Sequence, residues 1–112
     1  MTKDIIAFSD FQKLDLRVGK ILKVEKLVHS ERLVKMQVDM GQEIGIRQIL
    51  AGIAQWYSTK QLIGKKFIFV VNLEAKKMVG EQSCGMMLAS EVNGKCLLLP
   101  VNKKIPEGSV VR

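Results

Sequence analysis

The sequence predicts an all-β fold with short strands around a single core. The strictest signal is the segment from Val34 to Met40, where apolar and polar residues alternate as in a half-buried strand. The run from Phe67 to Val71 is aromatic and β-branched, which is typical of a strand buried on both faces. Asn93-Gly94 is a strong signal for a type I′ hairpin turn. Since 112 residues can bury one core and not two, we expect one domain over residues 1–112.

A short turn and a long first strand are expected before the alternating strand. Ser9 is suited to cap the turn. The apolar residues that would close one end of the core are Phe8, Phe11 and Leu14. A strand over residues 16–24 follows, and Gly19 within it suits the sharp bend or bulge of a closing barrel. Alternate residues of a strand share one face, and those that we expect to face the core are Leu16, Val18, Leu22 and Val24.

A reversal at residues 41–45, a third strand at 46–51 and one short helix follow the alternating strand. Ser58 and Gln61 fit a capping box, and Gly64 stands where that helix would end. Pro100 and Pro106 break the tail after the hairpin into short extended pieces. Five main strands with a helix between the third and the fourth are the architecture of the OB-fold. We expect its barrel over about residues 14–99 and a C-terminal extension over about residues 100–112.

The connection after the strand at 67–71 is polar and basic. Its notable residues are Asn72, Lys76, Lys77, Gly80 and Ser83, before an apolar run resumes over residues 85–89. Between Lys60 and Lys77 there are five lysines and one acid, Glu74. A polar loop held by two core strands is a typical place for a binding site.

The charge of the whole chain favours a polyanionic partner such as nucleic acid. The chain has 18 Lys and Arg against 11 Asp and Glu, a formal charge of +7 and a pI near 9.6. A basic protein without such a partner is the plain alternative.

The cysteines and the histidine indicate neither a metal site nor a disulfide scaffold. Cys84 and Cys96 form no CxxC motif and His29 is alone, so we expect no metal and no cofactor. The hairpin register would place Cys96 opposite Glu91, and Cys84 opposite Lys103. Unpaired thiols and the lack of a signal-peptide core near Met1 point to the cytoplasm. No segment has the length of a membrane span.

Several motifs, in order, resemble the tRNA-binding domain family, and the likeness covers about residues 8–112. They are Phe11-Gln12-Lys13-Leu14-Asp15-Leu16-Arg17-Val18-Gly19, Val38-Asp39-Met40-Gly41, Arg47-Gln48-Ile49-Leu50-Ala51-Gly52-Ile53, Leu62-Ile63-Gly64-Lys65-Lys66, Val71-Asn72-Leu73 and Gly80-Glu81-Gln82-Ser83-Cys84-Gly85-Met86-Met87-Leu88-Ala89. That family includes the C-terminal domain of methionyl-tRNA synthetase, free-standing structure-specific tRNA-binding proteins and cytokine-like domains of synthetase cofactors. The resemblance implies an OB-fold with a C-terminal extension, homodimerisation, and binding to the outer corner of folded tRNA with little base-sequence preference.

The resemblance also implies a set of tRNA-binding residues. Carried over by motif, these are Arg47, Asn72, Lys76, Lys77, Ser83 and Met86, with Lys65 and Lys66 as nearby basic support. The family usually has proline, arginine and lysine where this chain has Ala75-Lys76-Lys77, which keeps both charges and loses the planar guanidinium. The loop at His29 is two residues shorter than in the family.

Each of these residues also has a structural interpretation. The lysines fit a solvated basic face, Asn72 and Ser83 fit local backbone bonding, and Arg47 fits an ordinary surface ion pair. Met86 and Met87 are strand neighbours, so they point to opposite sides and one of them belongs to the core. The family motif favours Met86 at the surface.

Binding is expected, and catalysis is not. No Walker loop, dinucleotide fingerprint or paired-carboxylate motif is present, and nothing orders Cys84 and His29 as a dyad. Few aromatic rings remain to stack bases, so folded RNA is favoured over single strands. The leading hypothesis is a free-standing dimeric module that binds tRNA in trans. The alternatives are a peptide-binding chaperone of the related secretion-associated subgroup, with an apolar groove at Met78 and Met86, and an accessory subunit of methionyl-tRNA synthetase, which would make an aminoacyl-tRNA synthetase its partner.

Overall fold

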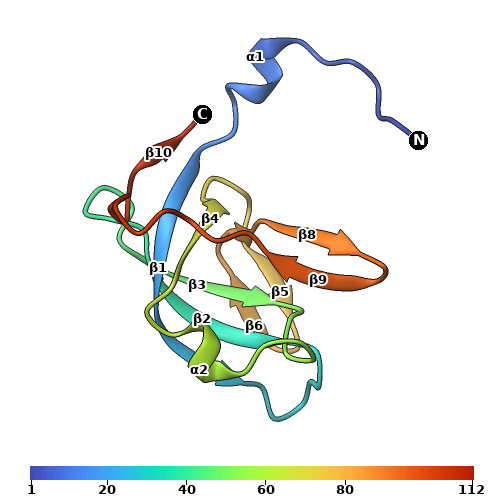
Figure 1. Cartoon of the computed structure of the whole chain (residues 1–112), viewed down its shortest axis with the longest axis vertical. Coiled ribbons are helices and arrows are strands. Elements are labelled where there is room, and N and C mark those ends of the chain that lie inside the picture. The colour runs from blue at the N-terminus through green and yellow to red at the C-terminus, as the bar shows by residue number, and fades with distance from the viewer.

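The structure is a computed structural model that describes all residues from 1 to 112, and strands dominate it (Figure 1). In chain order the elements are α1 (Phe8–Phe11), β1 (Leu16–Lys26), β2 (Val34–Asp39), β3 (Ile46–Ala51), α2 (Thr59–Leu62), β4 (Lys66–Val70), β5 (Lys76–Met78), β6 (Glu81–Ser83), β7 (Met86–Met87), β8 (Ala89–Val92), β9 (Lys95–Leu98) and β10 (Val110–Val111). The main sheet has the order β3-β2-β1-β4-β7 and curls into a nearly closed antiparallel barrel. This confirms the predicted OB-like barrel with a short helix between its third and fourth strands. Both helices are single turns, and neither has the length or apolar character to cross a bilayer.

The barrel closes along a seam where β3 meets the chain just before β7. The backbone amide of Cys84 donates to the carbonyl of Gln48 at 2.8 Å. The amide of Leu50 donates to Ser83 Oγ at 3.0 Å. One backbone bond and one side-chain bond therefore join the two ends of the sheet.

The β8–β9 hairpin has the predicted register, with Val92 opposite Lys95 and Glu91 opposite Cys96. The pairing stops at Ala89 and Leu98. The expectation that Cys84 lies opposite Lys103 was therefore wrong, because the chain leaves the hairpin at Ala89 and Cys84 bonds to β3 instead.

Strand β1 contains a bulge that reverses the predicted parity of its second half. Ile21 pairs with Val38 and Lys23 pairs with Gln37, so Leu22 is the extra residue. Ile21 is fully buried and Leu22 is 43% exposed, which corrects the expectation that Leu22 faces the core. The glycine serves a different purpose: a Cβ on Gly19 would lie 2.6 Å from Val38 Cγ1 and 2.8 Å from a Phe69 ring carbon. Gly19 thus allows β1 to cross close over the core.

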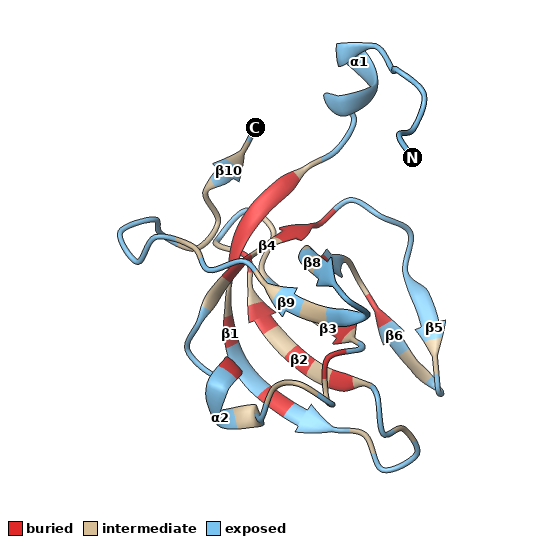
Figure 2. Cartoon of the chain, turned by 45° about the vertical axis from the view of Figure 1, so that its right-hand side comes forward, coloured by how far each residue is buried: buried red, intermediate tan, exposed pale blue.

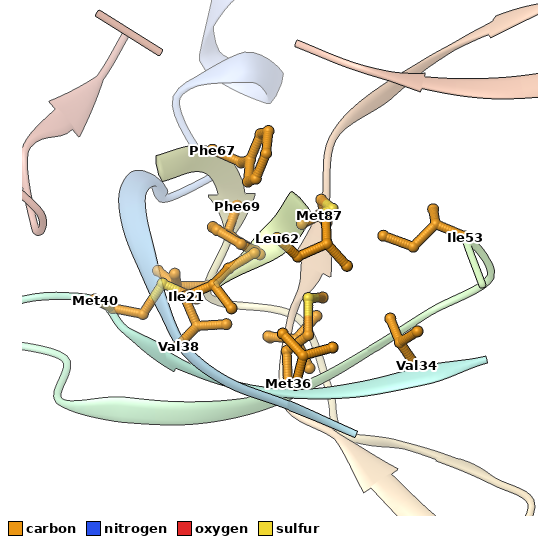
Figure 3. Close-up of a cluster of buried hydrophobic side chains, with 13 residues drawn as sticks. Ile21, Val34, Met36, Val38, Met40, Ile53, Leu62, Phe67, Phe69 and Met87 are labelled. Carbon is orange, nitrogen blue, oxygen red and sulfur yellow. The ribbon is translucent and has the colours of Figure 1, made fainter. Parts of the chain in front are cut away.

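The core fills the barrel and is shown in Figure 3. Its buried residues are Ile21, Val24, Val34, Met36, Val38, Met40, Ile49, Ile53, Leu62, Phe67, Phe69, Val71 and Met87. Leu62 comes from α2, so the helix closes one end of the barrel. The predicted capping box is confirmed: Gln61 N donates to Ser58 Oγ at 3.3 Å, and Ser58 N donates to Gln61 Oε1 at 2.8 Å.

The N-terminal segment does not close the other end, as the sequence had led us to expect. α1 stands away from the barrel (Figures 1 and 2), with Phe8 70% and Leu14 44% exposed. Ser9 lies inside the helix, whose N-cap is Ala7 and has no side-chain cap bond. The C-terminal extension pairs along the start of β1 on this side of the barrel, and no residue of α1 enters the core.

The extension runs along the first half of β1. Gly108 N donates to Val18 O at 2.7 Å, and Val18 N donates to Ser109 O at 3.0 Å. β10 then continues the pairing opposite residues 16 and 17. Since β4 covers the other edge of the same residues, this half of β1 is hydrogen-bonded on both sides.

Arg17 fastens the extension to the barrel. Its side chain is 11% exposed and donates to Asp15 Oδ1 at 2.7 Å, Glu43 Oε1 at 2.8 Å and Gly108 O at 3.3 Å. Hydrogen bonds to Asp15 and then to Glu43 raise the pKa of the guanidinium above its ordinary value. One buried cation thereby links β1, the β2–β3 turn and the extension.

Candidate nucleic-acid interface

The stretch predicted as a basic loop is a hairpin of two three-residue strands. β5 pairs with β6 so that Lys76 lies opposite Ser83 and Lys77 opposite Gln82. Val79 and Gly80 form the turn with positive φ angles of 51° and 80°. Gly80 is a typical turn residue, but a valine is unusual at positive φ, so the sequence did not mark a two-residue hairpin turn at this place. The hairpin projects from the barrel and is largely exposed (Figure 2).

The hairpin covers a hollow of about 490 Å³, which we call the hairpin hollow. Lys76, Met78 and Ser83 line it from the hairpin, and Met86 and Leu73 line it from the adjoining chain. Lys77 points away from the hollow, because neighbouring strand residues face opposite sides. Lys76 and Lys77 are both exposed and make no ion pair. The hollow thus places one cation, Lys76, and one carboxylate, Glu74, beside an apolar wall.

The two methionines separate as expected. Met86 is 50% exposed, whereas Met87 is 7% exposed and belongs to the core.

Arg47 on β3 is half-buried, and its Nη1 lies 3.5 Å from the carbonyl of Val71. This long bond leaves most of the donors of the guanidinium available to an anion.

Asn72 and Ser83 are occupied by the fold. Asn72 Oδ1 accepts from Asp15 N at 2.8 Å, and its Nδ2 donates to Lys13 O at 2.7 Å, so this side chain anchors the segment before β1. Ser83 is 4% exposed and donates to Gly85 O at 3.1 Å while accepting from Leu50 N at the seam. The structural interpretation was local backbone bonding: Ser83 makes one such bond, to Gly85 O, whereas Asn72 bonds only to backbone groups far away in the sequence.

Lys65 and Lys66 lie elsewhere. They line a second hollow of about 670 Å³, which we call the α2 hollow and which shares no lining residue with the hairpin hollow. Lys66 Nζ donates to Ile105 O at 2.9 Å and lies 3.6 Å from Glu107 Oε2. The structure therefore places Lys76 and Met86 at the same hollow, with Lys77 on the other face of β5, and leaves the pair at 65 and 66 at the opposite end of β4.

Gln48 positions the hairpin, and sequence reasoning missed it. Its Nε2 donates to Gln82 O at 2.9 Å and to Glu81 Oε1 at 3.3 Å, and Glu81 also lies 3.7 Å from Lys35 Nζ. These bonds hold β6 against β3 and β2. The only sequence signal was a polar residue at an outward position of β3, which is common on any strand.

The comparisons with known proteins agree with this architecture. Residues 16–110 match the model of the tRNA binding domain family. The methionine–tRNA ligase of Caldanaerobacter subterraneus subsp. tengcongensis is 47% identical over 108 residues, which cover 96% of this chain and 17% of the ligase. The ligase of Archaeoglobus fulgidus is 43% identical over 109 residues, which cover 97% of this chain and 16% of the ligase. The chain thus spans about a sixth of these relatives.

Two solved structures match over nearly their whole lengths. A MetRS-related protein from Pyrococcus horikoshii has a TM-score of 0.92 and 39% identity, with 98% of this chain and 100% of that chain covered. The chaperone CsaA from Bacillus anthracis str. Ames has a TM-score of 0.87 and 30% identity, with 97% and 100% covered. From the family match and these relatives we conclude that the chain belongs to the tRNA-binding domain family.

Proposed function

We propose that this domain binds folded tRNA at its outer corner, through phosphate contacts and shape, with little base-sequence preference. The observation that carries the proposal is the projecting β5–β6 hairpin, which presents Lys76 and Lys77 without an ion pair. Membership of the tRNA-binding domain family supports tRNA as the polyanion. The role is one of binding and not of catalysis.

The chemistry of the hairpin supports phosphate contact over base recognition. Lysines contact phosphates as point charges and carry no sequence information themselves. Asn72 and Ser83, the candidates for contacts to ribose or bases, are occupied by backbone groups of the protein. Phe67 and Phe69 are buried, so neither ring can stack a base, and Trp56 is half-buried and lines a hollow with Met86.

Titration of labelled folded tRNA by fluorescence anisotropy at several salt concentrations tests this proposal. We expect Lys76→Ala and Lys77→Ala each to weaken binding and to reduce the salt slope by about one unit per lost phosphate contact. Lys60→Ala is the control, because Lys60 is exposed on α2, makes no ion pair and does not line the hairpin hollow. An unchanged slope in both hairpin variants would assign these lysines to an ordinary solvated face.

We also propose that the domain acts as a homodimer through the apolar surface around α1. This surface exposes Ile5, Ile6, Phe8, Leu14 and Val110, at 101%, 65%, 70%, 44% and 57%. Full burial of one such side chain is worth about 1.5–3 kcal/mol, so a few of them suffice to stabilise a dimer. Two copies would present two hairpins to one RNA and raise the avidity. Sedimentation of Phe8→Glu should show a monomer with much weaker tRNA binding, and equal affinity at matched site concentration would refute the dimer.

A peptide-binding chaperone is the second candidate, and the apolar wall of the hairpin hollow favours it. Leu73 and Met86 are 44% and 50% exposed there, and the similar structure from Bacillus anthracis carries the name of a chaperone. An unfolded peptide added as competitor to the tRNA titration separates the two functions. Displacement by the peptide with little salt dependence would favour the chaperone, whereas displacement mainly by folded tRNA would favour the tRNA-binding function.

A third candidate is an accessory subunit of methionyl-tRNA synthetase, working in the cytoplasm. The similarity to methionine–tRNA ligases supports it. Co-purification of the synthetase with the native domain, at a salt concentration that releases tRNA, would test this partner.

A further inference from the structure

The α2 hollow carries a concentration of positive charge that the hairpin does not explain. Lys20, Lys65, Lys66 and Lys103 line it, and no carboxylate does. In Figures 1 and 2, α2 and the β5–β6 hairpin lie on different sides of the barrel. A ligand in the α2 hollow is therefore separate from one at the hairpin.

Lys66 shapes this hollow and does not serve as a free cation. Its Nζ donates to Ile105 O at 2.9 Å and to Lys103 O at 3.4 Å, and it lies 3.6 Å from Glu107 Oε2. These contacts use the donors of the ammonium group and hold the extension over the start of β4. They also fix the backbone of Lys103 at the rim of the hollow.

The remaining lysines have no carboxylate partner. Lys20, Lys65 and Lys103 make no ion pair. Lys20 lies directly opposite Lys66 across the β1–β4 pair, and like charges in that arrangement destabilise a sheet. Glu107 lies beside Lys66 and Lys20. A hydrogen bond from its own backbone amide, followed by the charges of Lys66 and Lys20, lowers the pKa of its carboxyl. One carboxylate offsets only part of this charge.

The floor of the hollow is apolar and partly aromatic. Phe67, Leu98 and Val101 line it, together with the ring of Tyr57. Tyr57 is held in place because its hydroxyl accepts from Leu98 N at 3.0 Å. Gln61 adds a polar side chain on the helix side. A volume of about 670 Å³ lies within the range of about 300–1,000 Å³ that is typical of small-molecule sites.

We propose that the α2 hollow is a second anion site, which binds the phosphate of a nucleotide between Lys20, Lys65 and Lys103 with the base against the apolar floor. A bare phosphate would use the lysines and leave the floor empty, and an uncharged nucleoside would use the floor alone. A nucleotide uses both. The phosphate is supplied either by a free mononucleotide or by one unit of an RNA strand, since the chemistry of the contact is the same.

NMR titration of the isotope-labelled domain tests this site directly. We expect AMP to shift the backbone amides of Lys65, Phe67 and Leu98 with a dissociation constant on the order of millimolar, as suits a shallow site. Inorganic phosphate should bind the same amides more weakly, and adenosine should bind weakest. In the double variant Lys65→Ala with Lys103→Ala, affinity for AMP should fall about tenfold, which corresponds to two modest charge contacts. Lys26→Ala should leave AMP binding unchanged.

Three results would overturn the proposal: AMP shifts located elsewhere, equal affinity for AMP and inorganic phosphate, or full affinity in the double lysine variant. A trinucleotide RNA in a parallel titration distinguishes the two sources of phosphate. Tighter binding of the trinucleotide would assign the site to RNA, and tighter binding of AMP would assign it to a free nucleotide. The variants Lys76→Ala and Lys77→Ala should not alter AMP binding. The tRNA function and this site can therefore fail independently.

Discussion

Replacing Ser83 with alanine asks whether this side chain holds the barrel closed or contacts RNA. Ser83 is 4% exposed, and its Oγ accepts from Leu50 N at 3.0 Å and donates to Gly85 O at 3.1 Å. Alanine retains the Cβ but removes both bonds, so a buried amide at the seam loses its partner. A buried polar group without a partner costs about 1–3 kcal/mol. We therefore expect the free energy of unfolding to fall by about 2 kcal/mol, at the middle of that range.

Urea unfolding followed by Trp56 fluorescence, at fixed protein concentration, measures this loss. With a urea slope of about 1–3 kcal/mol per molar for a protein of this size, the midpoint should fall by about 1 M. Ser90→Ala is the matched control, since Ser90 is half-buried and makes no side-chain hydrogen bond. Affinity for tRNA, measured where both variants are folded, should stay within about twofold, less than the tenfold that 1.4 kcal/mol represents. An unchanged midpoint combined with a large loss of tRNA affinity would refute the structural assignment.

Three more predictions concern β1 and the extension. Gly19→Ala should destabilise the domain by about 1–3 kcal/mol through overpacking, whereas Gly52→Ala, whose Cβ would meet only Arg32 Nη2 at 3.8 Å, should be nearly neutral in the same urea assay. Arg17→Met should cost about 1.5–3 kcal/mol through its lost charged hydrogen bonds, and hydrogen exchange should show the amide of Gly108 losing protection. Because the pKa of Glu107 is lowered on folding, its contribution to stability is present above the ordinary value of 4.5 and is lost as the pH falls below it. Glu107→Gln should therefore reduce the fall in stability between neutral and acid pH, and an identical pH profile would contradict this.

The sequence predicted the elements whose signals are local. The alternation of β2, the capping box before α2 and the Asn93-Gly94 turn each depend on a few neighbouring residues, and all three have the expected geometry. The separation of Met86 from Met87 also followed from strand alternation, together with the family motif.

What the sequence did not predict depends on contacts between distant residues. The bulge at Leu22 shifts parity in the middle of β1, and it shows only in the pairing with β2. The β5–β6 hairpin turns at a valine with positive φ, so it lacks the usual residue signal. Phe8 looked like core by composition, but α1 stands away from the barrel, and Phe8 stacks on Phe11 with 70% of its surface exposed.

The candidate site could be predicted as a region and less well as individual side chains. The lysines and Met86 are exposed at the hairpin, where the motif placed them. Asn72 and Ser83 lie nearby, but their polar atoms bond to backbone groups of the protein, and all of these except Gly85 O lie far away in the sequence. Lys65 and Lys66 stand at the start of β4, whereas the hairpin hollow lies beyond its other end. The full length of the strand therefore separates these two lysines from the hairpin hollow.

The first half of β1 is hydrogen-bonded on both edges, and this protects the chain against self-association by strand pairing. Open strand edges are templates for pairing with other chains and for aggregation. Residues 16 to 18 would offer such an edge next to β2 if the extension were absent, and they include two apolar side chains. The extension occupies that edge with Gly108, Ser109 and β10, so strand addition is blocked there by the protein's own backbone. The C-terminal residues thus prevent another chain from adding a strand at this edge. Association of the protein is left to side-chain surfaces, and open-ended growth of the sheet is blocked here.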